Sequence, residues 1–127
     1  MIKIFNRLAV VTNFEHPLFL ILMMMGLVSI LAGFIMIKFP PKKINSLYGY
    51  RTLNSMRSQE RWDYAQSYSA KEMIRAGIVL TLLSVVGLMN VMGPFIGMIT
   101  GVALMIVSFI SVSIRTEKAI NLKFGKE

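Results

Sequence analysis

Two long uncharged stretches constrain the fold of this chain more than any other feature. Residues 17–37 and 76–114 contain no Asp, Glu, Lys or Arg. A helix rises about 1.5 Å per residue and the hydrocarbon core of a bilayer is about 30 Å thick, so the first stretch is long enough for one crossing. The second is about twice that length, and the Gly93-Pro94 turn signal interrupts it. The sequence therefore predicts an all-α integral membrane protein with three transmembrane helices, over about residues 17–38, 73–91 and 94–114.

The chain length favours a single membrane domain covering residues 1–127. A connector over about residues 39–72 joins the first and second spans, and a tail over 115–127 follows the third. Positive residues are retained on the cytoplasmic side of a bacterial membrane. They crowd the connector and the tail, whereas the hairpin between the second and third spans has none. We expect the cell (cytoplasmic) membrane, with the N-terminus outside and the C-terminus in the cytoplasm, against a small contrary signal from Lys3 and Arg7.

The net charge of +8 follows largely from this topology. The basic residues flank spans instead of forming a fold of their own, which argues against nucleic acid as a partner and favours anionic lipid headgroups. The chain has no cysteine, so disulfides and thiolate chemistry are excluded. The N-terminal region shows no clear cleavable signal. Residues 2–14 are expected to form a short interfacial helix.

The connector carries an unusual mixture of polar and aromatic residues. Pro40-Pro41 ends the first helix. Lys42 and Lys43 then reach headgroup level, and Asn45 and Gly49 suit turns. Tyr50, Arg51 and Thr52 follow directly.

Beyond Thr52 the pattern becomes helical. From about Ser55, a helix N-cap type, an amphipathic helix is expected to lie at the interface and run into the second span. On it, Trp62 would be an interfacial anchor. Two interpretations of Arg51 stay open: a topological charge in contact with lipid phosphate, or an ion pair with Glu60 that fixes the connector.

Small and sulfur-containing residues raise further alternatives. Gly97 and Gly101 form a small-xxx-small pair that serves packing within the three-helix unit or, alternatively, a homodimer. The methionines, 11 in number, are scattered through apolar spans and are interpreted as flexible filler instead of Cu(I) ligands. The lone histidine, His16, is interpreted as an edge residue.

The chain lacks the residue sets that catalysis needs. It shows no Ser/His/Asp set, no metal-ligand spacing and no phosphate loop followed by Lys. We therefore expect a protein that is not an enzyme and has no cofactor or metal. The two uncharged stretches place no ionisable residue at mid-membrane depth. Proton relays and ion-coupled transporters usually need such residues there, so an ion-coupled pump is disfavoured.

Taken together, these residues resemble the signature of the SdpI family of small bacterial integral membrane proteins. The resemblance rests on Pro40-Pro41, Asn45, the run Gly49-Tyr50-Arg51-Thr52, Ser55, Glu60, Trp62 and Ala65, with Thr116-Glu117-Lys118 and Phe124 in the tail. It implies immunity: protection against a membrane-targeting peptide toxin, together with capture of a transcriptional repressor at the membrane. This chain is shorter than the namesake and corresponds to the shared three-helix module.

Three functions follow as hypotheses. The first is an immunity or envelope-protection protein whose partner is a peptide toxin. The second is a signalling scaffold that holds a cytosolic repressor. The third is an accessory protein that binds lipid phosphate. In each, Asn45, Gly49, Arg51, Glu60 and Trp62 are expected to organise the connector.

Overall fold

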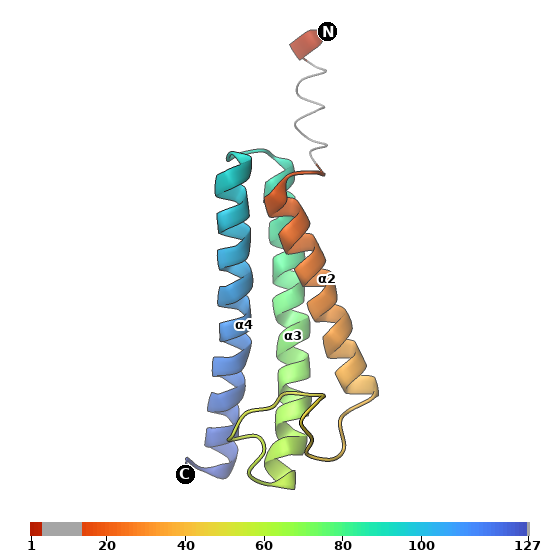
Figure 1. The fold of residues 1–127 in the computed structure, drawn as a ribbon, viewed down its shortest axis with the longest axis vertical. Helices are drawn as coiled ribbons and strands as arrows, with labels where there is room; N and C mark the ends of the chain where they lie inside the picture. The colour runs from red at the N-terminus through yellow and green to blue at the C-terminus, as the bar shows by residue number, and fades with distance from the viewer. Residues whose placement is uncertain (4–13, 127) are drawn as a thin grey trace.

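The computed structural model describes residues 1–3 and 14–126 and forms three long helices in them. These are α2 (Pro17–Lys38), α3 (Gln59–Leu88) and α4 (Pro94–Phe124). No strand occurs in the described residues, so the all-helical prediction is confirmed. Figure 1 shows α2 and α4 lying alongside α3, with the yellow connector folded against the end of the bundle where α4 terminates. The interfacial helix expected over residues 2–14 falls almost wholly outside the described residues.

The bounds of α2 follow from proline at both ends. Pro17 occupies the first helical turn, where its missing N–H costs nothing. His16 precedes it as N-cap, and its Nδ1 accepts a hydrogen bond from the Leu18 amide at 3.2 Å. Pro40 follows the C-cap Phe39 and prevents continuation. The helix therefore covers the residues predicted for the first span.

The connector helix differs from the prediction. It begins at Gln59 instead of about Ser55, with Ser58 as N-cap and its hydroxyl accepting from the Arg61 amide at 3.2 Å. It continues through residue 72 into the apolar half, so that the two parts form one helix of 30 residues. No proline or other helix breaker separates the two halves, so nothing forces the change of direction that an interfacial helix requires.

The α3–α4 hairpin and the end of α4 also shift two predicted boundaries. α3 ends at Leu88, three residues before the predicted end of the second span, and Asn90 turns the chain with φ +50°. α4 starts at Pro94 as predicted but runs on to Phe124, so most of the expected tail is helix. Its last turns carry polar residues that bond to the connector, which keeps them helical beyond the apolar stretch.

Close contact between α2 and α3 depends on glycine. A Cβ on Gly77 would lie 2.6 Å from the Gly26 carbonyl oxygen and 2.9 Å from the Ile30 amide nitrogen. Gly33 has the same relation to the carbonyl of Ala70, at 2.6 Å. Small residues let membrane helices approach backbone to backbone, where van der Waals contact supplies the stability.

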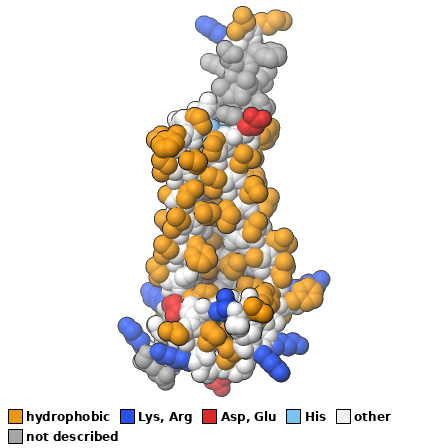
Figure 2. All heavy atoms as spheres, in the orientation of Figure 1, with side chains coloured by type: hydrophobic (Ala, Val, Ile, Leu, Met, Phe, Trp, Pro, Cys, Tyr) orange, Lys and Arg blue, Asp and Glu red, His pale blue; other side chains and the backbone are white. Residues whose placement is uncertain are grey.

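The outside of the bundle is apolar along α2, the second half of α3 and the first two thirds of α4. Figure 2 shows hydrophobic side chains along the bundle and Lys and Arg side chains gathered at the connector end. α2 and α4 are each long and apolar enough to cross a membrane, judged by length and composition. α3 carries Lys71, Glu72 and Arg75 directly before its apolar half and does not meet the same criterion.

Candidate functional site

The connector folds into a compact polar structure at one end of the bundle, which we call the cap (residues 39–58). Its first fixed point is Pro41, which is buried and whose carbonyl accepts a hydrogen bond from Trp62 Nε1 at 2.6 Å. The Trp62 side chain is 0 % exposed. Trp62 thus anchors the connector to α3 from inside the protein, whereas the sequence suggested a contact with the membrane interface.

Asn45 organises the next turn with its side-chain amide. Its Oδ1 accepts from the amides of Leu47 and Tyr48 at 2.9 and 2.7 Å, and its Nδ2 donates to the Lys43 carbonyl at 2.9 Å. This is the local backbone bonding that makes asparagine a turn residue. The Tyr48 hydroxyl then donates to the Phe39 carbonyl at 2.8 Å, so the loop closes on the end of α2.

Gly49 and Tyr50 press against Gln66 of α3. Gln66 Oε1 accepts from the Tyr50 amide at 2.6 Å while its Nε2 donates to the Tyr50 carbonyl at 2.8 Å. Gln66 is buried, and its side-chain amide satisfies both the N–H and the C=O of Tyr50, as the backbone of a neighbouring strand does in a sheet. Gly49 has φ +109°, and a Cβ there would lie 2.5 Å from Gln66 Oε1. Both the conformation and the close approach require glycine.

Thr52 and Ser55 bond to each other reciprocally. The Thr52 amide donates to Ser55 Oγ at 2.9 Å, and the Ser55 amide donates to Thr52 Oγ1 at 3.1 Å. Ser55 Oγ also lies 3.1 Å from the Tyr50 carbonyl oxygen, its acceptor, and the side chain is fully buried. The spacing of these two residues in the signature therefore has a structural explanation as a closed turn.

Glu117 of α4 collects the hydrogen bonds of the cap. Its Oε1 accepts from the Tyr50 hydroxyl at 2.8 Å and from the Thr52 hydroxyl at 2.7 Å, and its Oε2 accepts from Asn54 Nδ2 at 3.0 Å. Burial alone would raise the pKa of Glu117, but these three hydrogen bonds and the charge of Arg57 hold it below its ordinary value. The pKa of Tyr50 is raised by burial and by its bond to the carboxylate, so the phenol stays a donor.

A second layer of the same network reaches the end of α4. Arg61 Nη1 donates to Asn54 Oδ1 at 2.7 Å, and Arg61 Nη2 donates to the Gly125 carbonyl at 3.1 Å. Its guanidinium also lies 5.5 Å from the centre of the Phe124 ring. Arg61 is buried, and carbonyls at a helix C-terminus are a favourable partner for a cation. The cap is therefore bonded to both α3 and α4.

Arg51 and Glu60 do not form the expected ion pair. Arg51 Nη1 donates to the Ser46 carbonyl, and both side chains are exposed. No carboxylate pairs with Arg51 among the residues that the structure describes. The reason is geometric: Glu60 lies in the first turn of α3, which faces away once Trp62 and Gln66 point into the cap.

The remaining predicted residues occupy three places. Lys42 and Lys43 are exposed at the connector end, where Gln59 Nε2 donates to the Lys42 carbonyl at 2.6 Å. Gly97 and Gly101 lie in the first two turns of α4, at the other end of the bundle, against the His16 ring and Ile21 respectively. Both contacts are within the single chain.

His16 itself is buried, whereas the sequence suggested an edge residue. Its Nε2 lies 3.0 Å from the Met92 carbonyl oxygen and so ties α2 to the α3–α4 hairpin.

Several residues of the network escaped the sequence reasoning as site residues. They are Asn54, Arg61, Gln66, Glu72 and Glu117. Glu117 had a usable signal, since it is the single acid between residues 76 and 126. Glu72 is buried below the cap, 2.5 Å from Arg75 and 3.5 Å from Arg115, and joins α3 to α4.

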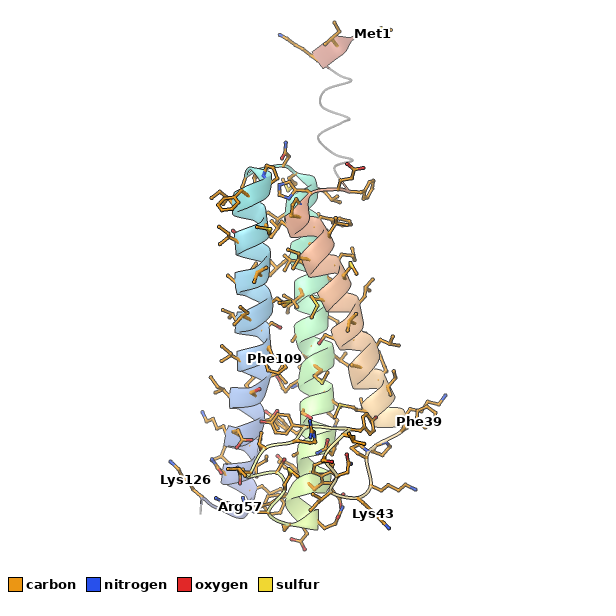
Figure 3. All side chains as sticks on the ribbon, viewed as in Figure 1. Met1, Phe39, Lys43, Arg57, Phe109 and Lys126 are labelled. Carbon is orange, nitrogen blue, oxygen red and sulfur yellow. The ribbon has the colours of Figure 1, made fainter. Side chains whose placement is uncertain are left out.

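The described residues contain no group of three or more His, Cys, Asp or Glu placed to hold a metal ion. What the cap offers chemically is a fixed arrangement of hydrogen bonds with exposed basic side chains around it. Figure 3 labels Lys43, Arg57 and Lys126 at this end of the molecule.

Known proteins share the part of the sequence that forms this arrangement. A Bacillus subtilis (strain 168) protein described as "Uncharacterized protein YfhL" is 51% identical over 55 residues, which is 43% of this chain and 50% of that protein. The chain thus spans about half the length of the curated relative it matches. No solved structure matches it. A model of the SdpI/YfhL protein family matches residues 42–119, which include nearly all of the cap, α3 and most of α4. Since this match covers more than half of the chain, the protein belongs to the SdpI/YfhL family.

Proposed function

We propose that this protein is a multi-pass membrane protein of the immunity type, which protects the cell membrane against a membrane-targeting peptide toxin without catalysing a reaction. Family membership supports this function, together with two helices apolar enough to cross a membrane. The observation that carries it furthest is the Glu117 network, because it turns the family signature into a rigid cap instead of a mobile loop.

We also propose that α3 is a third crossing. It lies between α2 and α4 in Figure 1, and its apolar half packs directly on α2 through Gly77. A helix held at that depth by two spanning neighbours shares their apolar surroundings. Lys71 and Arg75 would then lie at the interface, where long basic side chains extend toward water. The basic cap faces the cytoplasm in this arrangement.

The cap acts by binding. Its buried polar groups bond to one another, while Arg51, Lys42 and Lys43 are exposed around it. A rigid surface of this kind binds a toxin in the bilayer, or covers the membrane component that the toxin attacks, without rearranging. Preorganisation lowers the free-energy cost of such binding.

Expression in a toxin-sensitive host tests the proposal. Cells that make the wild-type protein are expected to survive a dose that kills cells with an empty vector. Arg51→Ala should abolish protection at equal abundance in the membrane, whereas Lys126→Ala, an exposed charge outside the cap, should not. Death of the wild-type cells despite normal membrane levels would refute the immunity function for this chain.

Capture of an acidic cytosolic regulator is a second candidate, favoured by the concentration of Lys and Arg at the cap end in Figure 2. It must be examined with the full-length protein, because Tyr50, Thr52 and Asn54 depend on α4 for their positions.

A further inference from the structure

A groove with a volume of about 820 Å³ lies between α2 and α4 and opens at the cap. Its walls are apolar and include Met25, Ala32 and Met36 from α2 and Met105 and Phe109 from α4. Figure 3 labels Phe109 on the stretch of α4 above the connector. The groove exists because α2 packs on α3 over its whole length, whereas its contact with α4 through Ile21 lies near the opposite end.

The groove is as long as one leaflet of a bilayer. On α2 its lining extends from Met25 to Met36, which corresponds to about 16 Å of helix. Half of a hydrocarbon core about 30 Å thick is about 15 Å. The groove starts at the end of α2 that carries the cap, so it covers the leaflet nearest the cap.

The mouth of the groove carries one exposed cation next to hydroxyl groups that are already engaged. Tyr48 donates to the Phe39 carbonyl, and Tyr50 and Thr52 donate to Glu117. Arg51 lines the same mouth and is exposed, with one of its nitrogens on the Ser46 carbonyl. A guanidinium presents five N–H donors, so several remain for an anion. Phosphate is the anion found at this depth of a membrane, and it matches the guanidinium fork.

We propose that this groove holds one anionic phospholipid of the surrounding bilayer, with its acyl chains between α2 and α4 and its phosphate on Arg51. This goes beyond the proposed immunity function and does not depend on it. The lipid closes the open side of the bundle, and its headgroup becomes part of the surface that the cap presents.

A helix from a second copy or from a peptide fits the space less well. A helical segment is a rigid rod about 10 Å across, so it needs that width along the whole length of the groove. Flexible hydrocarbon chains adapt to a narrower space, whereas a helix would have to push α2 away from Gly77 on α3, where backbone contact leaves no slack.

The test uses the full-length protein reconstituted with equal amounts of phosphatidylglycerol and phosphatidylcholine, which carry the same acyl chains, followed by native mass spectrometry of the retained lipid. We expect one retained lipid per chain, with phosphatidylglycerol enriched about fivefold, the effect of a single basic residue near an anionic headgroup. Arg51→Gln should remove the enrichment, and Lys43→Gln, which lies outside the groove, should preserve it.

A second pair of variants tests the apolar part independently of charge. Ala32→Phe fills the groove and should at least halve the retention of both lipids. Ala103→Phe adds the same side chain to an exposed position of α4 outside the groove and should leave retention unchanged. If Arg51→Gln fails to fold, the comparison of Ala32→Phe with Ala103→Phe still tests whether the groove holds lipid.

Equal retention of the two lipids by the wild-type protein would overturn the proposal, as would full retention by Ala32→Phe. Recovery of a dimer or of a bound peptide without lipid would assign the groove to a helix instead. Because the readout is lipid, a failure here leaves the survival test of immunity unaffected, and the reverse holds as well.

Discussion

At the scale of single residues, Glu117 holds the cap to the bundle. Three side chains of the connector donate to one carboxylate, which keeps its pKa below the ordinary value despite burial. The unfolded chain therefore binds a proton at Glu117 more readily than the folded protein does. Stability from this group is fully present above the ordinary pKa of 4.5 and is lost as the pH falls toward the lower folded value.

Glu117→Gln is expected to destabilise the protein by about 1–2 kcal/mol at neutral pH, because hydrogen bonds to a charged acceptor are lost from a partly solvent-screened site. The difference from wild type should begin to shrink as the pH falls below about 4.5 and should become small once the pH falls through the lower folded pKa, where the wild-type carboxyl is also neutral. Thermal unfolding followed by the fluorescence of Trp62, the single tryptophan, measures it. Glu60→Gln, at an exposed acid, is the control, and a pH-independent difference would contradict the role of the charge.

Local signals in the sequence identified some residues of the cap but could not supply their long-range partners. Asn45 and Gly49 were predicted as turn residues, and their bonding and positive φ are properties of the local backbone. The partner of Tyr50 and Thr52 was not predictable, because Glu117 is 65 or more residues away and reaches them through the packing of α4. The predicted Arg51–Glu60 pair was wrong for the same reason. It was inferred from proximity in sequence, whereas the direction in which the first turn of α3 faces depends on long-range packing.

At the scale of elements, the prediction succeeded where proline marks a boundary. Pro17, Pro40 and Pro94 define the ends of α2 and the start of α4. It failed at the end of α4, where the apolar pattern stops at Ile114 but the helix continues, stabilised by polar contacts such as Asn121 with Asn54. A hydropathy pattern predicts which segments lie in lipid. It does not predict how far a helix continues beyond the bilayer when polar contacts with the rest of the protein stabilise it.

The α2–α3 contact yields an element-scale prediction. Gly77→Ala places a methyl group 2.6 Å from a backbone carbonyl of α2, and backbone cannot move aside cheaply. We expect a loss of about 1–3 kcal/mol, typical of overpacking, and a lower unfolding temperature in detergent. Gly93→Ala is the matched control, because a Cβ there meets no atom within 4 Å. Because alanine favours a helix interior over glycine, a Gly77→Ala variant as stable as the wild type would show that the close contact does not constrain this position.

At the scale of the whole molecule, the two ends of the bundle differ in charge. The cap and the last turns of α4 lie at one end of the bundle and carry most of the Lys and Arg. The N-cap residue of α2, His16, and the α3–α4 hairpin lie at the other end. In the orientation proposed above, which keeps the cap in the cytoplasm, the hairpin lies outside the cell. This arrangement depends on α3 crossing the membrane, because the cap and the hairpin are the two ends of that helix.

The absence of native cysteine makes the topology directly measurable. Asn90→Cys, in the exposed hairpin, is expected to react with a membrane-impermeant maleimide in intact cells. Lys43→Cys and Lys126→Cys, both exposed at the cap end, should react after permeabilisation alone. Reaction of Lys43→Cys in intact cells, with Asn90→Cys protected, would invert the orientation. Equal reaction of all three in intact cells would mean that α3 does not cross, since its two ends would then lie on the same side of the membrane.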